Sequence, residues 1–294
     1  MNSKQTAHQA NVRGAEVIDL VGLEKDFAEL TGHIRDLPVA RDVPPGTFTH
    51  DLEHEYRFDA PVTIEQIVSD VQAWLDRGNV HTISPRYYGL FNPAVHFAGV
   101  VADLLTAVYN PQVGGWFHSP AATEIEQYTL RTLARLAGID RPVSAHFTSG
   151  GSEANLTAVL AALAHRFPEY RTGGVAAIKG RPLLFVSAEA HHSFWKTAQH
   201  TGIGRDAVRI VGVDEQLRMQ PGQLRQEIRR ARDKGNLPFL VVATAGTTAA
   251  GVIDPLVDVA GVCRDEDVWF HVDAAWGGGC LLSPTLRHYL DGVR

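Results

Sequence analysis

Beyond Gly138 the chain alternates short apolar runs with longer amphipathic stretches, and this alternation constrains the fold more than any other feature. The runs have the length of strands, and the stretches between them have the length of helices. Strands that are separated by helices pair in parallel, with helices covering the sheet. We therefore predict an α/β fold with a mostly parallel sheet. The predicted strands are residues 144–148, 183–187, 208–213, 239–244 and 268–272, and the predicted helices are residues 152–166, 193–201, 222–234 and 255–265.

The first 140 residues or so are expected to be mainly helical. An amphipathic helix that Gly78 would end is predicted from the apolar stripe Ile64, Ile67, Val68, Val71 and Leu75. We also predict a short helix near residues 17–30, a buried helix in the apolar segment 95–109, and a helix that opens with a capping box of Thr123 and Glu126. Residues 1–80 are expected to form a helical N-terminal arm, and residues 81–294 a large domain.

Composition argues against several classes of protein. A net charge of −6 and the absence of a basic stripe argue against a nucleic-acid partner. Cys263 and Cys280 form no CxxC pair, so neither a disulfide framework nor a zinc site is predicted, and the cytoplasm is the expected compartment. No apolar run reaches the ~18 residues of a membrane span, and the polar N-terminus lacks the apolar stretch of a signal peptide.

A glycine-containing turn joins the first predicted strand to its helix, at Gly150, Gly151 and Ser152. Glycines allow close approach of a ligand, and the first N–H groups of a helix are unpaired, so the turn is suited to a phosphate. It is neither a Walker loop nor the GxSxG elbow of a hydrolase. The alternative is an ordinary strand-to-helix turn in which Ser152 is the N-cap.

His191 follows the second predicted strand, where α/β proteins place their ligands. An imidazole at this point could stack on a flat ring or transfer protons. The alternative is that His191 and His192 are solvent-facing residues at the start of a helix.

Asp273 ends the last predicted strand and is followed by small residues. Its carboxylate could pair with a cationic ring nitrogen while Ala275 leaves room for a planar ring, or Asp273 could simply cap the next turn. Hydroxyls also end the fourth strand, in the run Thr244 to Thr248, where they are more often part of a turn than of a ligand site. Asp254 and Pro255 read as an N-cap and the first residue of a helix, so Asp254 is given no chemical role.

The order and spacing of these motifs resemble the group II pyridoxal-phosphate (PLP) amino-acid decarboxylases, which have the aspartate-aminotransferase fold. The motifs are TSGGSEAN at 148–155, AHHS at 190–193, TAGTTAAGVIDP at 244–255 and HVDAAWGGG at 271–279. HTISPRYYGLFNP at 81–93 and WFHSPAATEIE at 116–126 are also similar to the N-terminal region of that family. The resemblance covers the chain from about residue 60 onward.

The resemblance implies a three-layer PLP-binding large domain and a role for each matching residue. Gly150, Gly151 and Ser152 would hold the cofactor phosphate. The pyridine ring would lie between His191 and Ala275, Asp273 would pair with its nitrogen, and Thr248 would lie near the rim of the cofactor. A carboxylate opposite the nitrogen keeps the ring protonated, which makes it a better electron sink.

One feature departs from the family. Its cofactor is held as a Schiff base by a lysine about thirty residues after the aspartate, whereas the last lysine here is Lys234, before Asp273. Lys196, on the helix after the histidine motif, is interpreted as a surface residue or a residue at the rim of the site. A gene fragment, an experimentally shortened chain, one half of a split enzyme and a catalytically inactive relative are all compatible with an end at Arg294.

The absent strands should lie between the first strand and the aspartate strand. We therefore expect the Gly150–Ser152 turn to be separated from Asp273, two sheet edges to be open, and the chain alone to be poorly stable unless a partner supplies those strands. The leading hypothesis is a cytoplasmic, homodimeric decarboxylase of an L-amino acid, with HVDAAWGGG slightly closer to glutamate-type than to aromatic members. The rival hypothesis is a non-catalytic subunit that pairs with a lysine-bearing chain.

Overall fold

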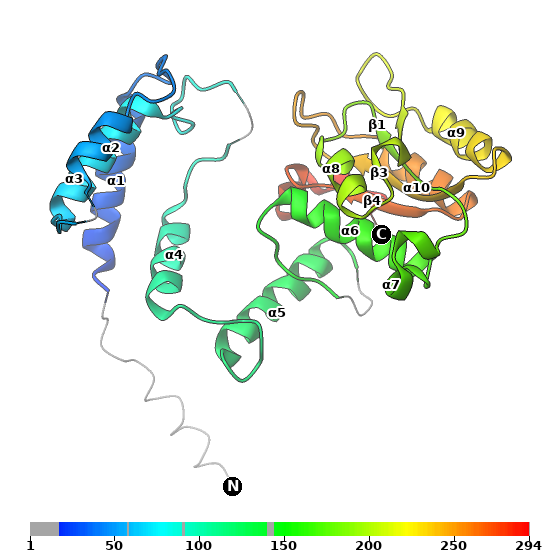
Figure 1. The fold of residues 1–294 in the computed structure, drawn as a ribbon, viewed down its shortest axis with the longest axis horizontal. Coiled ribbons are helices and arrows are strands. Elements are labelled where there is room, and N and C mark those ends of the chain that lie inside the picture. The colour runs from blue at the N-terminus through cyan, green and yellow to red at the C-terminus, as the bar shows by residue number, and fades with distance from the viewer. Residues whose placement is uncertain (1–17, 58, 90–91, 140–143, 294) are drawn as a thin grey trace, which may run out of the picture. The chain divides into compact units, whose positions relative to one another are not determined.

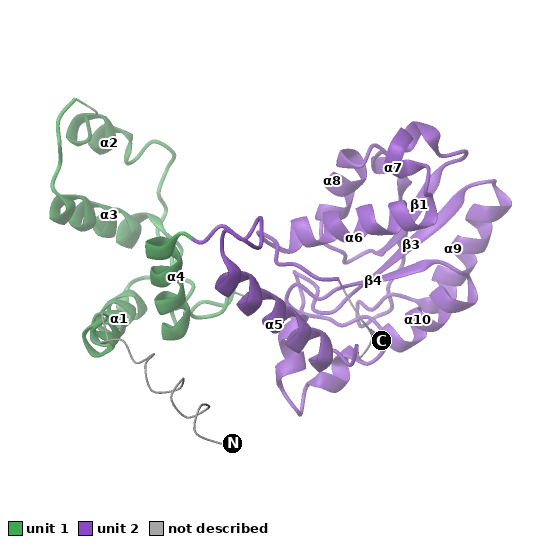
Figure 2. Cartoon of the chain, turned by 90° about the horizontal axis from the view of Figure 1, so that it is seen from below, with its two compact units in different colours: residues 1–110 green, residues 111–294 purple. Residues whose placement is uncertain are grey.

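The computed structural model describes residues 18–57, 59–89, 92–139 and 144–293, which fall into two compact units (Figure 2). Unit 1 comprises residues 1–110 and unit 2 comprises residues 111–294. Residue 17, where the first helix is predicted to begin, and residues 90–91 of the motif at 81–93 lie outside the described residues.

Unit 1 is helical and unit 2 alternates strands with helices (Figure 1). The helices of unit 1 are α1 (Leu20–Asp36), α2 (Thr49–Glu55), α3 (Ile64–Gly78) and α4 (Phe97–Tyr109). Unit 2 contains α5 (Pro120–Leu136), α6 (Gly151–Arg166), α7 (Tyr170–Gly173), η1 (Val175–Ala177), β1 (Pro182–Ser187), α8 (Ser193–His200), η2 (Arg205–Ala207), β2 (Val208–Val211), α9 (Pro221–Asp233), β3 (Leu237–Thr244), α10 (Leu256–Asp265), β4 (Trp269–Asp273), η3 (Gly277–Leu282) and η4 (Arg287–Leu290).

The four strands of unit 2 form one parallel sheet in the order β2-β1-β3-β4. Each of them overlaps a predicted strand, so the predicted α/β class and parallel sheet are confirmed. The register places Thr244, at the end of β3, beside Asp273, at the end of β4. The carboxyl ends of these two neighbouring strands therefore meet at one edge of the sheet.

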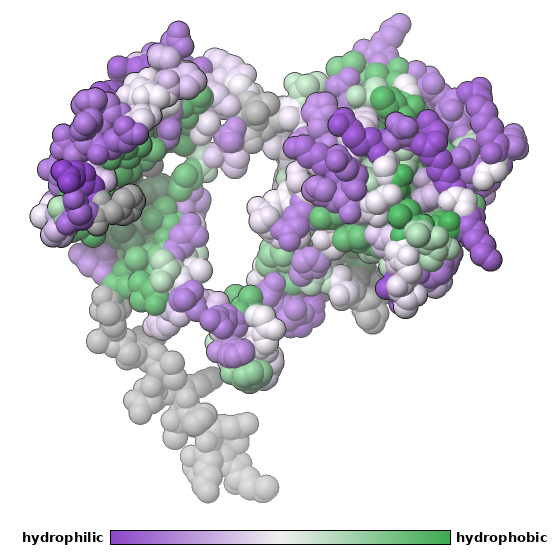
Figure 3. Space-filling view, in the orientation of Figure 1, coloured by the Kyte–Doolittle hydropathy of each residue, from purple (hydrophilic) through white to green (hydrophobic). Residues whose placement is uncertain are grey.

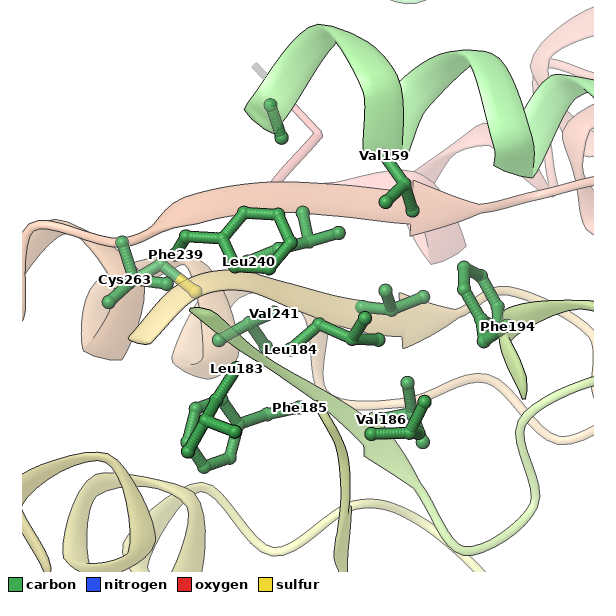
Figure 4. Packing of buried hydrophobic residues seen from close by; sticks show 14 of the residues in the cluster. Val159, Leu183, Leu184, Phe185, Val186, Phe194, Phe239, Leu240, Val241 and Cys263 are labelled. Atoms are coloured by element: carbon green, nitrogen blue, oxygen red, sulfur yellow. The ribbon is translucent and has the colours of Figure 1, made fainter. Parts of the chain in front are cut away.

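Helices cover both faces of the sheet and make the three layers of the unit (Figure 2). Helices α6 and α8 lie on one face, and α9 and α10 lie on the other. The central strands are apolar runs whose side chains are buried almost throughout, as a sheet covered on both faces requires. Their side chains pack with Val159 of α6 and Cys263 of α10 in one hydrophobic cluster (Figure 4).

The predicted strand at 144–148 is wrong, because these residues form no strand in the described structure. A strand exists only through hydrogen bonds to a neighbour, and no described strand pairs with this segment. β4 is accordingly an edge strand that pairs only with β3 among the described elements, and Trp269 on it is 39% exposed. The expected open edge along the aspartate strand is therefore present, whereas the one along residues 144–148 is not formed.

Two predictions about helices also need correction. The helix expected to start at Thr123 starts at Pro120, and the Thr123 hydroxyl donates to the Ser119 carbonyl at 2.8 Å rather than capping with Glu126. The proline sets the start, since a first-turn position suits its fixed φ and its lack of an N–H group. The helix at 97–109 forms as expected but buries no side chain in the described structure.

Unit 1 holds its helices together through scattered contacts rather than a core. His33 of α1 lies 2.7 Å from Asp76 of α3, and the Tyr56 hydroxyl donates to Asp70 at 2.7 Å. This hydrogen bond to Asp70 is the main reason that the pKa of Tyr56 is raised to about 12. Among described residues 18–110, only His81 and Ser84 are buried, so the apolar stripe of α3 remains open to solvent.

Asp254 is not the helix cap that its position before a proline predicts. Helix α10 begins one residue later than expected, with Pro255 as its N-cap. The Asp254 carboxylate is buried and accepts backbone N–H groups from Met219 at 2.7 Å and from Thr244 at 2.8 Å. It thus fixes the end of β3 to the loop after β2, and its burial raises its pKa.

We predict that Asp254→Asn lowers the free energy of unfolding of the complete protein by about 1–3 kcal/mol, because the amide NH2 group faces a buried N–H in place of an acceptor. Urea denaturation followed by circular dichroism measures the change. Asp258→Asn is the matched control, since Asp258 is exposed in the first turn of the same helix and should contribute only a few tenths of a kcal/mol. Equal stability losses in the two variants would contradict this role of Asp254.

Candidate functional site

Three elements of unit 2 meet at the carboxyl end of β4. They are the end of β4 itself, the first turns of α6, and the segment that leads into α8. Ligand sites of open α/β sheets lie at the carboxyl ends of strands, so this is where one is expected.

Asn155 connects the three elements. Its Nδ2 donates to Asp273 Oδ2 at 2.8 Å and to Ser193 Oγ at 3.0 Å, and its Oδ1 lies 2.9 Å from His271 Nε2. Asn155 is only 3% exposed and Ser193 only 2%. The side-chain amide therefore uses both its hydrogens and its oxygen inside the protein, where hydrogen bonds are strongest.

Asp273 is buried and held from two sides. Its Oδ2 accepts from Asn155, and its Oδ1 accepts the backbone N–H of Ala275 at 3.2 Å. The second bond shows that Asp273 does cap the turn after β4, which was the alternative interpretation. This capping bond uses only one acceptor site of Oδ1, and a carboxylate has about four such sites, so Asp273 can accept further hydrogen bonds.

The Thr244 side chain is a buried neighbour of Asp273 with an unused hydroxyl. Thr244 pairs with Asp273 across the two strands, so both side chains point to the same face of the sheet. Its Oγ1 is the one buried side-chain polar atom without a partner in the part of the chain that the structure describes. Such an atom is costly unless something bonds to it, and a bound water or a ligand would supply the partner.

The turn before α6 offers backbone N–H groups. Gly150 is the N-cap of α6 and makes no side-chain cap, so the alternative in which Ser152 caps the helix is wrong. Glu153 instead accepts from the N–H and the hydroxyl of Ser149, at 2.8 and 2.6 Å, and these bonds lower its pKa. Among the described residues, the N–H groups of Gly150, Gly151 and Ser152 have no acceptor.

Gly151 lies directly against Ala275. A Cβ added at Gly151 would lie 2.8 Å from the Cβ of Ala275, closer than two carbon atoms can approach. At Gly150, by contrast, a Cβ would have nothing within 4 Å. The glycine-containing turn, Ala275 and Asp273 are therefore brought together. The predicted separation of this turn from Asp273 is wrong, because Asn155 joins α6 to β4 without the intervening strands.

His191 and Thr248 are less closely tied to this cluster. The imidazole of His191 is exposed, and its Nδ1 accepts the N–H of Ser193 at 3.2 Å, so the neutral ring carries its proton on Nε2. His192 is also exposed, as the alternative reading of this pair expected. Thr248 is exposed in the loop after β3, and no contact joins it to Asp273 among the described residues. It is Thr247 that is buried there, accepting from Val252 at 3.1 Å.

Three residues of this cluster were not predicted from the sequence, namely Asn155, His271 and Ser193. The positions of Asn155 and His271 in their helix and strand nevertheless indicate polar side chains that are at least partly buried. Asn155 shares the buried stripe of α6 with Val159, Ala162 and Leu163, and a polar residue in such a stripe needs polar partners. His271 has the same parity as Asp273 in β4, so both side chains face α6. Burial lowers the pKa of His271, although the Asp273 charge opposes this shift.

The described residues contain neither a membrane-spanning helix nor a metal-binding cluster. No helix there is both long and apolar enough to cross a membrane. No group of three or more histidine, cysteine, aspartate or glutamate residues there is arranged to hold a metal ion.

The fold and this cluster define an α/β protein with a candidate ligand site at the carboxyl ends of parallel strands. The family described as "Pyridoxal-dependent decarboxylase conserved domain" matches residues 45–294. The chain therefore belongs to the pyridoxal-dependent decarboxylase family, as its motifs predicted, and the cofactor of this family is PLP.

Solved structures agree with this assignment. Mouse CSAD is 34% identical with a TM-score of 0.83, over 93% of this chain and 57% of that one. Oryza sativa TDC, solved with PLP and tryptamine, is 26% identical with a TM-score of 0.82, over 96% of this chain and 59% of that one. Rhodiola rosea 4-hydroxyphenylacetaldehyde synthase is 29% identical with a TM-score of 0.79, over 94% of this chain and 61% of that one. The chain thus spans about three fifths of the length of these proteins.

The residues of the site fit PLP. An acceptor for the ring nitrogen is present in the Asp273 carboxylate, which Asn155 and the Ala275 N–H already hold in place. Unused N–H groups at the start of α6 suit a phosphate, and the space beside Gly150 is open. The unpartnered Thr244 hydroxyl adds a buried polar atom beside Asp273.

We predict that Gly151→Ala destabilises the complete protein by about 1–3 kcal/mol, because the new methyl group collides with Ala275. Adding Ala275→Gly should restore most of the loss by removing the opposing methyl group. Thermal unfolding of both variants measures this, with Gly150→Ala as the matched control at a site with open space and extended backbone, φ 167°. A Gly151→Ala protein as stable as the Gly150→Ala protein would contradict the close contact.

Proposed function

We propose that the chain provides the PLP-binding part of an enzyme that decarboxylates an L-amino acid to an amine. In this proposal the N–H groups of Gly150, Gly151 and the adjoining Ser152 bind the phosphate. His191 and Ala275 contact the two faces of the pyridine ring, Asp273 binds its nitrogen, and Thr248 lies at its rim. Residues 1–80 form the arm and residues 81–294 the cofactor-binding domain.

In this proposal the cofactor, Asp273 and His191 have different chemical roles. PLP, when bound, supplies an electron sink for the pair left on the substrate carbon when CO2 departs. Asp273 holds a proton on the ring nitrogen, because a buried carboxylate stabilises the adjacent cation. The exposed imidazole of His191, whose Nδ1 accepts the Ser193 N–H, would orient a carboxyl group or move a proton through Nε2.

The observation that carries the proposal is the carboxylate of Asp273. It is 7% exposed, is held by a buried amide, and lies at the end of a strand beside an unpartnered hydroxyl. Burying a carboxylate costs free energy unless a positive charge lies beside it. A protonated pyridine ring would supply that charge.

The rival proposal is a non-catalytic subunit that needs a lysine-bearing chain. The two proposals differ in where PLP becomes covalently attached. Borohydride reduction of the PLP-loaded protein followed by peptide mapping separates them: a label on the polypeptide that carries Asp273 supports the enzyme, and a label only on a second polypeptide supports the rival.

We predict that Asp273→Asn lowers the rate of CO2 release by the complete protein on the order of 100-fold or more, because the amide no longer stabilises a protonated ring. Release of labelled CO2 from a panel of acidic and aromatic L-amino acids measures the rate and identifies the substrate class. Glu215→Gln, which removes one exposed carboxylate outside the site, is the control. Full activity in Asp273→Asn would refute the assigned role of Asp273.

A homodimer is part of this proposal, and the apolar surface of unit 1 supports it. No hydrophobic side chain of described residues 18–110 is buried, although α4 consists largely of apolar residues. Hydrophobic surface is visible over α4 in Figure 3. A groove of about 480 Å³ is lined by apolar side chains of α1 and α3, including Phe27, Ile34 and Leu75. Exposed apolar surface of this kind marks an interaction site, and a second copy of the chain is the proposed occupant.

We predict that Val108→Glu weakens self-association of the complete protein by about tenfold or more, because it would bury an unpaired charge. Val108 is 71% exposed on α4. Sedimentation equilibrium measures the association constant, and Thr106→Glu puts the same charge at a polar position of the same helix as a control. A monomeric wild-type protein, or equal weakening by the two variants, would contradict this interface.

The cytoplasm is the proposed compartment. Cys263 and Cys280 are both free, and burial raises the pKa of the Cys263 thiol to about 12. Free thiols are usual for proteins kept in a reducing compartment.

A further inference from the structure

We propose that His271 and Asn155 are positioning residues that act through Asp273 on the ring nitrogen of PLP. This inference deepens the proposed function and rests on it. Hydrogen bonds run from His271 through Asn155 to Asp273, and we call these three residues the relay.

Each member of the relay forces the orientation of the next. An ionised carboxylate only accepts hydrogen bonds, so Asp273 must face the NH2 group of Asn155. The Asn155 amide is thereby oriented with its oxygen toward His271. Since an amide oxygen only accepts, His271 must carry a proton on Nε2. Ser193 accepts the second NH2 hydrogen, which leaves the amide no other arrangement.

His271 is well placed to keep this arrangement. Its ring is partly buried between α6 and β4, and Phe194 packs edge-on against it with ring centroids 6.1 Å apart. The relay thus ends on a side chain that is held by packing rather than by solvent. Removing the Nε2–H donor would leave the Asn155 oxygen buried without a partner, and the amide could turn over and present that oxygen to Asp273.

A turned amide would place a second oxygen beside the carboxylate. Asp273 would then lose one donor and gain a repulsive neighbour, so its orientation toward the ring nitrogen would change. The effect should be specific to a ligand that has a proton on that nitrogen. This specificity separates a positioning role from a general structural one.

The experiment compares PLP with 1-deaza-PLP, which has a carbon in place of the ring nitrogen, in the complete protein. Their dissociation constants are measured by fluorescence titration, and the ratio of the two constants gives the preference for PLP. We expect a clear preference in the wild type and an approximately tenfold smaller one in His271→Phe. His271→Gln, whose amide can still donate to Asn155, should retain the preference to within about twofold.

Two further variants serve as controls. Asn155→Leu should lose the preference at least as fully as His271→Phe. His165→Phe makes the same substitution at an exposed histidine that contacts Trp269 of the same strand, and it should leave the preference unchanged. Circular dichroism of each variant verifies folding, and His271→Gln keeps the test informative where the phenylalanine variant is unstable.

The outcomes distinguish a failure of the relay from a failure of the proposed function. Equal weakening of both ligands in His271→Phe, or an unchanged preference there, would overturn the relay and leave the proposed function standing. A wild-type protein that binds neither ligand, or binds both equally, would overturn the proposed function together with the relay. Loss of preference in His271→Phe with retention in His271→Gln is the result that supports the relay.

Discussion

The hydrogen bond from Asn155 to Asp273 is the interaction on which the site depends. It joins residues 118 positions apart in the chain and fixes the first turns of α6 against the end of β4. Because both groups are buried, neither can exchange its partner for water, and loss of one would leave the other unsatisfied. The close contact of Gly151 with Ala275 follows from the same attachment, since it occurs one helical turn earlier on the same helix. A turn suited to a phosphate and a carboxylate suited to a pyridinium are thereby held in one place.

The described surface also shows what the chain leaves uncovered. Unit 2 buries a continuous cluster around β1 and β3, yet among the described strands β4 pairs with β3 alone. Unit 1 buries no hydrophobic side chain in its described residues. The two units thus differ in kind: unit 2 has a core of its own and an open sheet edge, and unit 1 has amphipathic helices whose described apolar side chains are exposed.

Much of unit 2 could be predicted from the sequence because its elements have local signals. The buried runs of β1 and β3 are continuous and apolar, and α6 and α9 have the helical spacing that covers a sheet. The segment 144–148 has the same local signal but pairs with no described strand, so propensity alone did not make it a strand. Asp254 shows another limit: its place before a proline predicts a helix cap, whereas its partners lie at Met219 and Thr244 and come only from the tertiary structure. For the site, the order of motifs located the glycine-containing turn and Asp273, but not the amide of Asn155 that connects them.

The central claim is that Asp273, held by Asn155, keeps the ring nitrogen of PLP protonated. Nitrogen-15 NMR of the complete protein loaded with PLP labelled at the ring nitrogen tests this directly. The structure predicts the chemical shift of a protonated pyridine nitrogen at neutral pH. A chemical shift characteristic of the unprotonated nitrogen at neutral pH would contradict the claim, because Asp273 would then have no positively charged ring nitrogen to pair with.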